Sequence, residues 1–225
     1  VLLFSFLTGA YESYTKLKYI KAIKWVLLDL KIPQDPGKSP KATEQIFASL
    51  HGILPPPIKW RDKFFKGKMV DWISFEIVGI GGETHFYIRT PEQYKKLVQS
   101  QIYAQYPDTE ISEVVDDYIN FLPASLPGDS YDLFGSEMTL SKEDFYPIRT
   151  YSEFEEKSSG PDSIKRIDPL ASLAEVLSSL ESGEFLGVQL LVRPARDGWV
   201  KKGQAEMDKL QGKKPKVILP VHLYG

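Results

Sequence analysis

Cysteine is absent from the 225-residue sequence, and histidine is scarce. Without cysteine there are no disulfides, no thiolate nucleophiles and no cysteine-ligated metals, and the composition suits a reducing compartment. The three histidines, His51, His85 and His222, are spaced in no metal-ligand pattern. We therefore expect neither a metal site nor any other cofactor.

An excess of charge is also lacking. Lysine and arginine number 28 against 30 acids, which gives a formal net charge of -2 and a pI near 6.0. This balance offers no global electrostatic reason to bind nucleic acid, so a basic function would need local clustering. The 42% hydrophobic content is enough for one large or two small cores.

The N-terminal segment, "VLLFSFLTGAYESYTKLKYIKAIK", begins with an apolar run over residues 1–10 that is much shorter than the ~20 residues of a bilayer span. Because the first residue is not Met, we expect the chain to be a piece of something longer. Tyrosines and lysines follow with one acid, Glu12, and this order is typical of a transmembrane helix leaving the membrane on the cytoplasmic side. The alternatives are an amphipathic helix packed on the domain and the tail of a signal sequence. The predicted membrane-interface residues, whose lysines would contact anionic headgroups, are Tyr11, Tyr14, Lys16, Lys18, Tyr19, Lys21 and Lys24.

Residues 25–116 carry alternating strand and helix patterns. Apolar residues alternate in four segments, and two segments with helical spacing lie between them. The apolar faces expected for the first three strands carry Val26, Leu28, Leu30, Ile32, Ile73, Phe75, Ile77, Phe86 and Ile88. Those expected for the two helices carry Ala42, Ile46, Phe47, Leu50, Ile53, Tyr94, Leu97, Val98, Ile102 and Tyr106. The resulting order, βαββαβ, predicts an α+β fold of the ferredoxin-like sandwich type. The expected strands are 25–33, 71–80, 84–90 and 109–115, and the expected helices are 40–53 and 91–106.

The patterns in the rest of the chain predict a connector and a second, partial unit. Residues 117–134 are rich in Pro, Gly and Ser and read as a connector. In 135–225 we expect a second, partial βαβ-type unit, with a helix capped by Asp168, an alternating strand and a polar helix from Trp199 to Gln211. The phrases "SPKATEQIFASL" and "DPLASLAEVLSSL" look alike, which is either a weak internal repeat or chance similarity between amphipathic helices. The segment 1–24 precedes both units as the membrane-exit segment.

Two glycine motifs suggest nucleotide binding, and neither withstands inspection. Gly37-Lys38-Ser39 matches the end of a phosphate-binding loop, but Ile32 occupies the first-glycine position and nearby prolines remove amide donors. Ser39 is better explained as a helix cap. "GIGGET" joins two expected strands, so it predicts a hairpin turn rather than a dinucleotide fingerprint.

An RNA-recognition module would need aromatics on the central strands of this sheet. His85, Tyr87 and Arg89 share one face of the third strand, but Asp29 and Leu27 on the first strand make a poor platform. We expect this face to pack against the second half or a partner, and we expect no direct nucleic-acid binding.

Catalytic residues are not evident either. The acidic segments Asp116-Asp117 and 153–156 lie near connectors, where carboxylates are usually solvated. No nucleophile with a neighbouring base can be named from spacing. We expect no enzyme activity within this chain.

Three stretches resemble a known family: "KATEQIFASLHGI", "DWISFEIVGIGGETHFYIRTPEQYKKLVQSQIYAQYPDTEI" and "DPLASLAEVLSSLESGEFLGVQLLVRPARDGWVKKGQ". Together they resemble the region ahead of the motor in membrane-anchored ATPases of conjugative DNA-transfer (type IV secretion) systems, in its uncharacterised-domain form. The resemblance extends from Trp25 to about Gln211 and includes no catalytic signature. In that family a membrane helix precedes the region and a hexameric RecA-type motor of the HerA/FtsK kind follows it.

The resemblance implies a non-catalytic assembly or docking domain at the cytoplasmic face of the cell membrane. Its partners would be lipid at the N-terminal segment and protein subunits of a secretion or membrane assembly, and a homo-oligomer would follow from the motor. An ATPase domain would then lie beyond residue 225. The alternative is a free-standing ferredoxin-like module that binds a ligand or regulates a partner.

Overall fold

The computed structural model describes residues 2–33, 41–123, 125–128, 131–148, 150, 155–157, 164–166 and 170–213. Its centre is a five-stranded sheet in the order β4-β1-β3-β2-β7. Every neighbouring pair is antiparallel. The strands are β1 (Trp25–Lys31), β2 (Ile73–Ile80), β3 (Glu83–Pro91), β4 (Glu110–Glu113) and β7 (Phe185–Val192).

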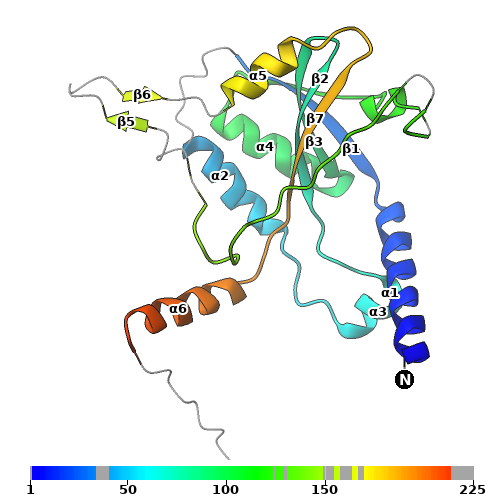
Figure 1. The fold of residues 1–225 in the computed structure, drawn as a ribbon, viewed down its shortest axis with the longest axis vertical. Helices are drawn as coiled ribbons and strands as arrows, with labels where there is room; N and C mark the ends of the chain where they lie inside the picture. The colour runs from blue at the N-terminus through cyan, green and yellow to red at the C-terminus, as the bar shows by residue number, and fades with distance from the viewer. Residues whose placement is uncertain are drawn as a thin grey trace, which may run out of the picture.

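Helices cover one face of this sheet. Figure 1 shows α2 (Lys41–Leu50), α4 (Lys95–Gln105) and α5 (Ala171–Ser178) on the same side of the strands. The alternation in β1 sends Val26, Leu28 and Leu30 toward α2 and α4, where they join one buried cluster. Helical spacing supplies the other half of that cluster, with Ile46 and Leu50 on α2 and Val98 and Ile102 on α4. The sequence patterns predicted these residues as core, and this is confirmed. Ile32 and Phe86, assigned to the same apolar faces, are instead exposed.

The helix α5 lies close to the backbone of β2, and a glycine makes this approach possible. A Cβ atom at Gly79 would stand 2.6 Å from both Leu177 Cδ2 and Leu180 Cδ1. Real Cβ atoms do not come that close, so any larger residue here would force the ends of these two leucine side chains to move. Leu177 is 2% exposed as a result of this contact.

The predicted α+β class is confirmed, but β7, in the second half of the chain, belongs to the same five-stranded sheet as β1 to β4. We expected a partial βαβ-type unit over 135–225, and the structure instead places β7 antiparallel to β2, from Phe185 opposite Ile80 to Val192 opposite Ile73. The physical reason is that β2 offered a free edge with a matching apolar alternation, which β7 extends. The predicted caps Ser39 and Asp168 lie outside the described residues.

The remaining elements agree in part with the sequence patterns. The polar helix is present as α6 (Gly198–Leu210), while the only pairing in the described part of 135–170 is the short hairpin of β5 (Glu155–Lys157) and β6 (Ile164–Arg166). Gly81 and Gly82, with φ of +55° and +88°, form the turn of the β2–β3 hairpin as predicted. Gly37-Lys38-Ser39 lies outside the described residues.

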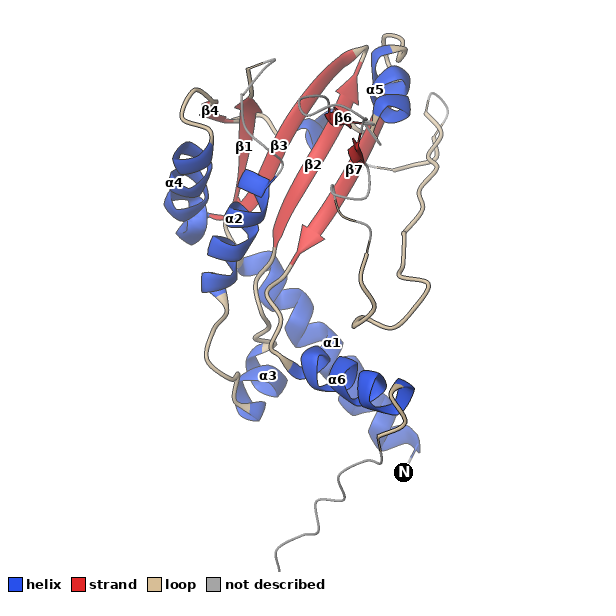
Figure 2. Ribbon diagram, turned by 90° about the vertical axis from the view of Figure 1, so that its left-hand side faces the viewer, coloured by secondary structure: helices blue, strands red, loops and turns tan. Residues whose placement is uncertain are grey.

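Two elements stand apart from the sheet. The helix α1 (Leu2–Ala22) runs away from the start of β1, and the short helix α3 (Trp60–Lys66) lies beside it. Both views show this pair at one end of the molecule, beyond the strands (Figures 1 and 2). The sequence patterns did not predict α3.

Candidate functional site

The first half of α1 exposes a continuous apolar surface. Leu3, Phe4 and Phe6 are each more than 70% exposed, and Leu7 is 56% exposed. Large apolar side chains that cluster on a surface mark contact sites more often than isolated ones do. Within the part of the chain that the structure describes, no helix is both long enough and apolar enough to cross a bilayer.

The second half of α1 is fastened to α3. Thr15 is 5% exposed, and its hydroxyl donates a hydrogen bond to the carbonyl oxygen of Phe64 at 3.1 Å. The rings of Tyr11 and Phe64 are 5.3 Å apart. Gly67 ends α3 with a φ of +63°, and a Cβ there would lie 2.1 Å from the Thr15 carbonyl oxygen. Only glycine allows this close approach, so the α1–α3 contact is encoded at residue 67.

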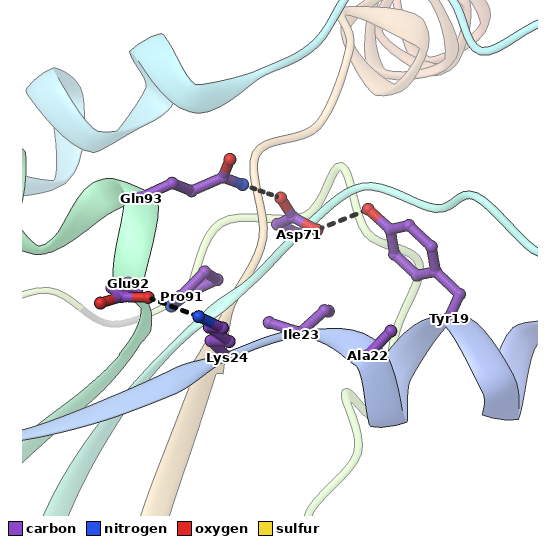
Figure 3. Close-up of a pocket in the computed structure, with 8 residues that line it drawn as sticks. All are labelled: Tyr19, Ala22, Ile23, Lys24, Asp71, Pro91, Glu92 and Gln93. Carbon is purple, nitrogen blue, oxygen red and sulfur yellow. Dashed lines mark hydrogen bonds and ion pairs between the residues drawn. The ribbon is translucent and has the colours of Figure 1, made fainter.

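A buried carboxylate joins α1 to the sheet. Asp71 is 8% exposed and accepts hydrogen bonds from the Tyr19 hydroxyl at 3.1 Å and the Gln93 amide at 3.0 Å (Figure 3). It also accepts one from the Tyr94 hydroxyl at 3.0 Å. Burial first, and then the Asp71 charge, raises the pKa of Tyr94 to about 12. The same two causes raise the pKa of Tyr19. Both phenols therefore stay protonated as donors at neutral pH.

A cavity of about 290 Å³ lies beside this carboxylate, between the end of α1 and the end of β3. Across it, the Lys24 Nζ lies 4.0 Å from a Glu92 carboxylate oxygen, and the Glu92 amide donates to the Lys24 carbonyl at 2.8 Å (Figure 3). The cavity is therefore part of the joint between helix and sheet. Its lining consists of Tyr19, Ala22, Ile23, Lys24, Asp71, Pro91, Glu92 and Gln93.

Three of the predicted interface residues point outward together. Tyr14, Lys18 and Lys21 follow Leu7 at spacings of seven, four and three residues, which places all four on one face of α1. Tyr14 is 63% exposed, and both lysines are exposed. This face passes from apolar to aromatic to basic along the helix.

The other predicted interface residues are engaged within the protein. Tyr11 packs on α3, and Tyr19 binds Asp71. Lys16 forms an ion pair of 3.0 Å with Glu12 one turn earlier, and its hydrogen bond is the main cause of the lowered pKa of Glu12. Lys24 remains 85% exposed beside the cavity. Sequence spacing could not separate these two groups, because both are tyrosines and lysines on the same helix.

The second face of the sheet holds a buried ion network. The Glu76 side chain is fully buried and receives the Arg89 Nε at 3.2 Å and the Tyr118 hydroxyl at 2.7 Å. Arg89 also binds both carboxylate oxygens of Asp117 through its two terminal nitrogens. Gln189, on β7, donates to the Tyr118 hydroxyl at 3.1 Å. The network ties β2, β3 and β7 to residues 117–118.

The network shifts the pKa values of Asp117 and Tyr118. Hydrogen bonds from Arg89 are the main cause that holds the pKa of Asp117 below its ordinary value. Burial, followed by the hydrogen bond to Glu76, raises the pKa of Tyr118 to about 12. Asp117 is thus a structural carboxylate, although its position next to a connector had suggested a solvated one.

An aromatic stack lies on the same face, where we considered RNA binding. The ring centroids of His85 and Tyr87 are 5.4 Å apart, those of Tyr87 and Tyr118 5.5 Å, and those of Tyr118 and Phe185 5.6 Å, all in stacked geometry. Tyr87 is 8% exposed and Tyr118 4% exposed. We expected this face to pack against the second half or a partner. It is covered in part by Tyr118 of the connector, which the prediction did not include, and in part by Phe185 and Gln189 of β7.

The surface element that sequence reasoning missed is α3. Its sequence, "WRDKFFK", is too short for a periodicity argument, although its mixture of aromatic and basic residues resembles that of α1. Among the described residues, no group of three or more acidic or histidine side chains is placed to hold a metal ion.

Comparison with known proteins gives one match, to a protein family. No curated protein and no solved structure matches the chain. The profile of a domain of unknown function, DUF8128, matches residues 15–216. That match includes the sheet, all its covering helices, and α1 from Thr15, the residue that docks on α3. The chain belongs to the DUF8128 family.

Proposed function

We propose that this chain is a non-catalytic assembly domain that docks at a membrane surface through α1. The observation that carries the proposal is the division of α1 into two halves. The first half exposes Leu3, Phe4, Phe6 and Leu7, and the second half is held by Thr15 and Tyr19. A helix fixed at one end and apolar at the other is suited to attach a folded domain to a bilayer.

The domain itself suits a scaffold. Its sheet has apolar packing on one face and a buried ion network with stacked aromatics on the other. Buried side chains of this kind hold positions rather than react. The strand order β4-β1-β3-β2, with α2 and α4 on one face, supports our interpretation of residues 25–113 as a ferredoxin-like core, to which β7 adds a fifth strand.

The larger assembly is proposed from the resemblance described above. We place the domain at the cytoplasmic face of the membrane, ahead of a motor of a conjugative DNA-transfer system, where it would contact protein subunits and form a homo-oligomer. Sequencing of the native gene tests this part. A reading frame that continues into Walker A and B motifs supports it, and a frame that ends at residue 225 removes it.

Vesicle flotation tests the membrane contact. The intact chain should float with vesicles of phosphatidylcholine and phosphatidylglycerol, and a variant with serine at the four exposed apolar positions of α1 should not. A matched variant carries serine at four other exposed apolar positions: Phe121, Phe134, Met138 and Leu191. Equal flotation of both variants would overturn the membrane proposal.

One observation favours the alternative of a ligand-binding regulatory module. The cavity beside Asp71 has a lining of mixed polar and apolar side chains and lies at the joint between α1 and the sheet. A small polar ligand there would change how firmly α1 is held. Calorimetric titration with small amines and amides, on the intact chain and on Asp71→Asn, would test it. Binding that Asp71→Asn abolishes would support the alternative, and no binding would dismiss it.

A further inference from the structure

We propose that α3 is a second lipid-contacting element, which lies at the headgroup level of an anionic bilayer beside α1. The inference rests on the proposed membrane contact and adds to it a site that is separate in sequence. The two contacts together would fix the domain against rotation about the α1 axis, which a single helix cannot do.

Exposed aromatics are the first observation. Trp60 is 68% exposed and Phe65 is 56% exposed. Their ring centroids are 6.3 Å apart, so the two rings form one surface on α3. The ring of Phe64, 5.2 Å from that of Phe65, packs on Tyr11 of α1. The short helix therefore has one side attached to the protein and one aromatic side in solvent.

Charge is the second observation. Residues 59–68 carry five basic side chains and one acid, in a chain whose net charge is -2. The acid, Asp62, pairs with Lys66 at 2.8 Å, and Arg61 lies over the Trp60 ring at 5.7 Å. The basic residues, all exposed, are Lys59, Arg61, Lys63, Lys66 and Lys68. Exposed aromatics surrounded by lysine and arginine match the chemistry of an anionic membrane interface.

Position is the third observation. α3 contacts α1 at Tyr11 and Thr15, and Phe4 lies seven residues before Tyr11. At 1.5 Å per residue this separation is about 10 Å along the helix. If the first turns of α1 enter the acyl region, α3 is held where headgroups meet the acyl chains. Tryptophan and lysine are the residues that favour this depth.

The contact between α3 and α1 makes this arrangement rigid. The left-handed Gly67 and the Thr15 hydrogen bond set the position of α3 on α1. Helices α1 and α3 lie together at one end of the molecule (Figure 2), and both carry exposed aromatic side chains there. An acidic protein could in principle contact the same charges, and the experiment below distinguishes the two.

The test uses the intact chain with single substitutions and vesicles of phosphatidylcholine with phosphatidylglycerol. Phe65→Ala should lower the partition coefficient about tenfold, because an exposed ring that would be buried in lipid is lost. Its matched control is Phe121→Ala, at another exposed phenylalanine in a short helical turn, which should leave partitioning unchanged. Lys63→Gln should lower partitioning about fivefold. Its control is Lys31→Gln, at the far end of β1.

A second measurement avoids any effect of Phe65→Ala on the fold of α3. Brominated lipids quench tryptophan fluorescence when the ring lies within the bilayer. Quenching should be stronger in the intact chain than in Trp60→Phe, because Trp25 lies in β1, Trp72 just before β2 and Trp199 in α6. Equal quenching would mean that Trp60 does not enter the membrane.

The outcomes separate this inference from the proposed function. If the α1 serine variant loses flotation while the Phe65 and Lys63 variants partition like their controls, α3 is not a lipid contact and the membrane proposal stands. If the intact chain binds no vesicles of either composition, both fail. Binding that is equal on pure phosphatidylcholine would contradict the role of the basic residues and leave an acidic protein as the partner.

Discussion

Replacing Arg89 should lower the free energy of unfolding by a large amount. It is the shared cation of two carboxylates, binding Glu76 through Nε at 3.2 Å and Asp117 through both terminal nitrogens. The Glu76 side chain is fully buried, whereas the Asp117 side chain is 28% exposed. Arg89→Met keeps an unbranched apolar stem and removes the charged guanidinium group.

The loss of unfolding free energy in Arg89→Met depends on which of the two carboxylates can be hydrated once the arginine is gone. Removing one partner of a buried ion pair costs about 3–5 kcal/mol, because the other charge is left in a poorly solvated site. Asp117 can be hydrated after the change, and Glu76 keeps the Tyr118 hydroxyl at 2.7 Å. We therefore expect the lower end, about 3 kcal/mol, which is a large part of the 5–15 kcal/mol that stabilises a typical domain.

Urea unfolding followed by tryptophan fluorescence and circular dichroism measures this cost. Lys31→Met is the matched control, since Lys31 forms an exposed ion pair of 3.9 Å with Glu110 and should contribute less than about 1 kcal/mol. Replacing both buried partners, as in Glu76→Leu with Arg89→Met, should recover much of the loss. If Arg89→Met were no more destabilising than Lys31→Met, the network would not be a stabilising unit.

The pH dependence of the same pair of proteins gives an independent check. The pKa of Asp117 is lowered in the folded state, mainly by hydrogen bonds from Arg89. A lowered pKa contributes stability above the unfolded value, near 3.9, and this contribution disappears as the pH falls through the folded value. Arg89→Met lacks the contribution, so the difference in unfolding free energy should narrow below about pH 4. A constant difference would show that Asp117 is not coupled to Arg89.

Three further perturbations have defined outcomes. Gly79→Ala should cost about 1–3 kcal/mol by overpacking against Leu177, measured by the shift in the urea midpoint, and an unchanged midpoint would mean that α5 is not seated on β2. Asp71→Asn should lower the pKa of Tyr94 from about 12, measured by ultraviolet titration of the phenols. It should also speed hydrogen exchange in the second half of α1. If neither change occurs, Asp71 does not hold α1 on the sheet. Since the pKa of Tyr118 is also raised to about 12, the protein should lose stability between about pH 10 and 12, where the unfolded phenols ionise first; in Tyr118→Phe part of this loss should vanish.

The local patterns predicted the core with good accuracy. Period-two alternation in β1 and β2 identified Leu28 and Ile73 as core residues, and both are at most 1% exposed. Helical spacing did the same for Val98 on α4. These predictions succeed because a strand or helix with one apolar face has a single favourable side to bury, whatever covers it.

The candidate site was predicted only in outline. The tyrosines and lysines of α1 were identified as an interface group, but sequence spacing could not show that Tyr19 binds Asp71, 52 residues away. The segment containing α3 gave no signal by period, since seven residues make only about two helical turns. Only the folded structure shows that α3 lies against α1, through the contacts of Thr15 and Gly67.

The sequence by itself determined which side of each element is apolar, the hairpin at Gly81 and Gly82, and the lack of cysteine chemistry. Only the tertiary structure decided that β7 extends the first sheet, that Arg89 joins Glu76 to Asp117, and that α3 stands beside α1. The physical reason is that side-chain periodicity reports the need for a partner without identifying it. The choice among partners depends on close contacts between residues distant in the chain, and these exist only when the whole chain is folded.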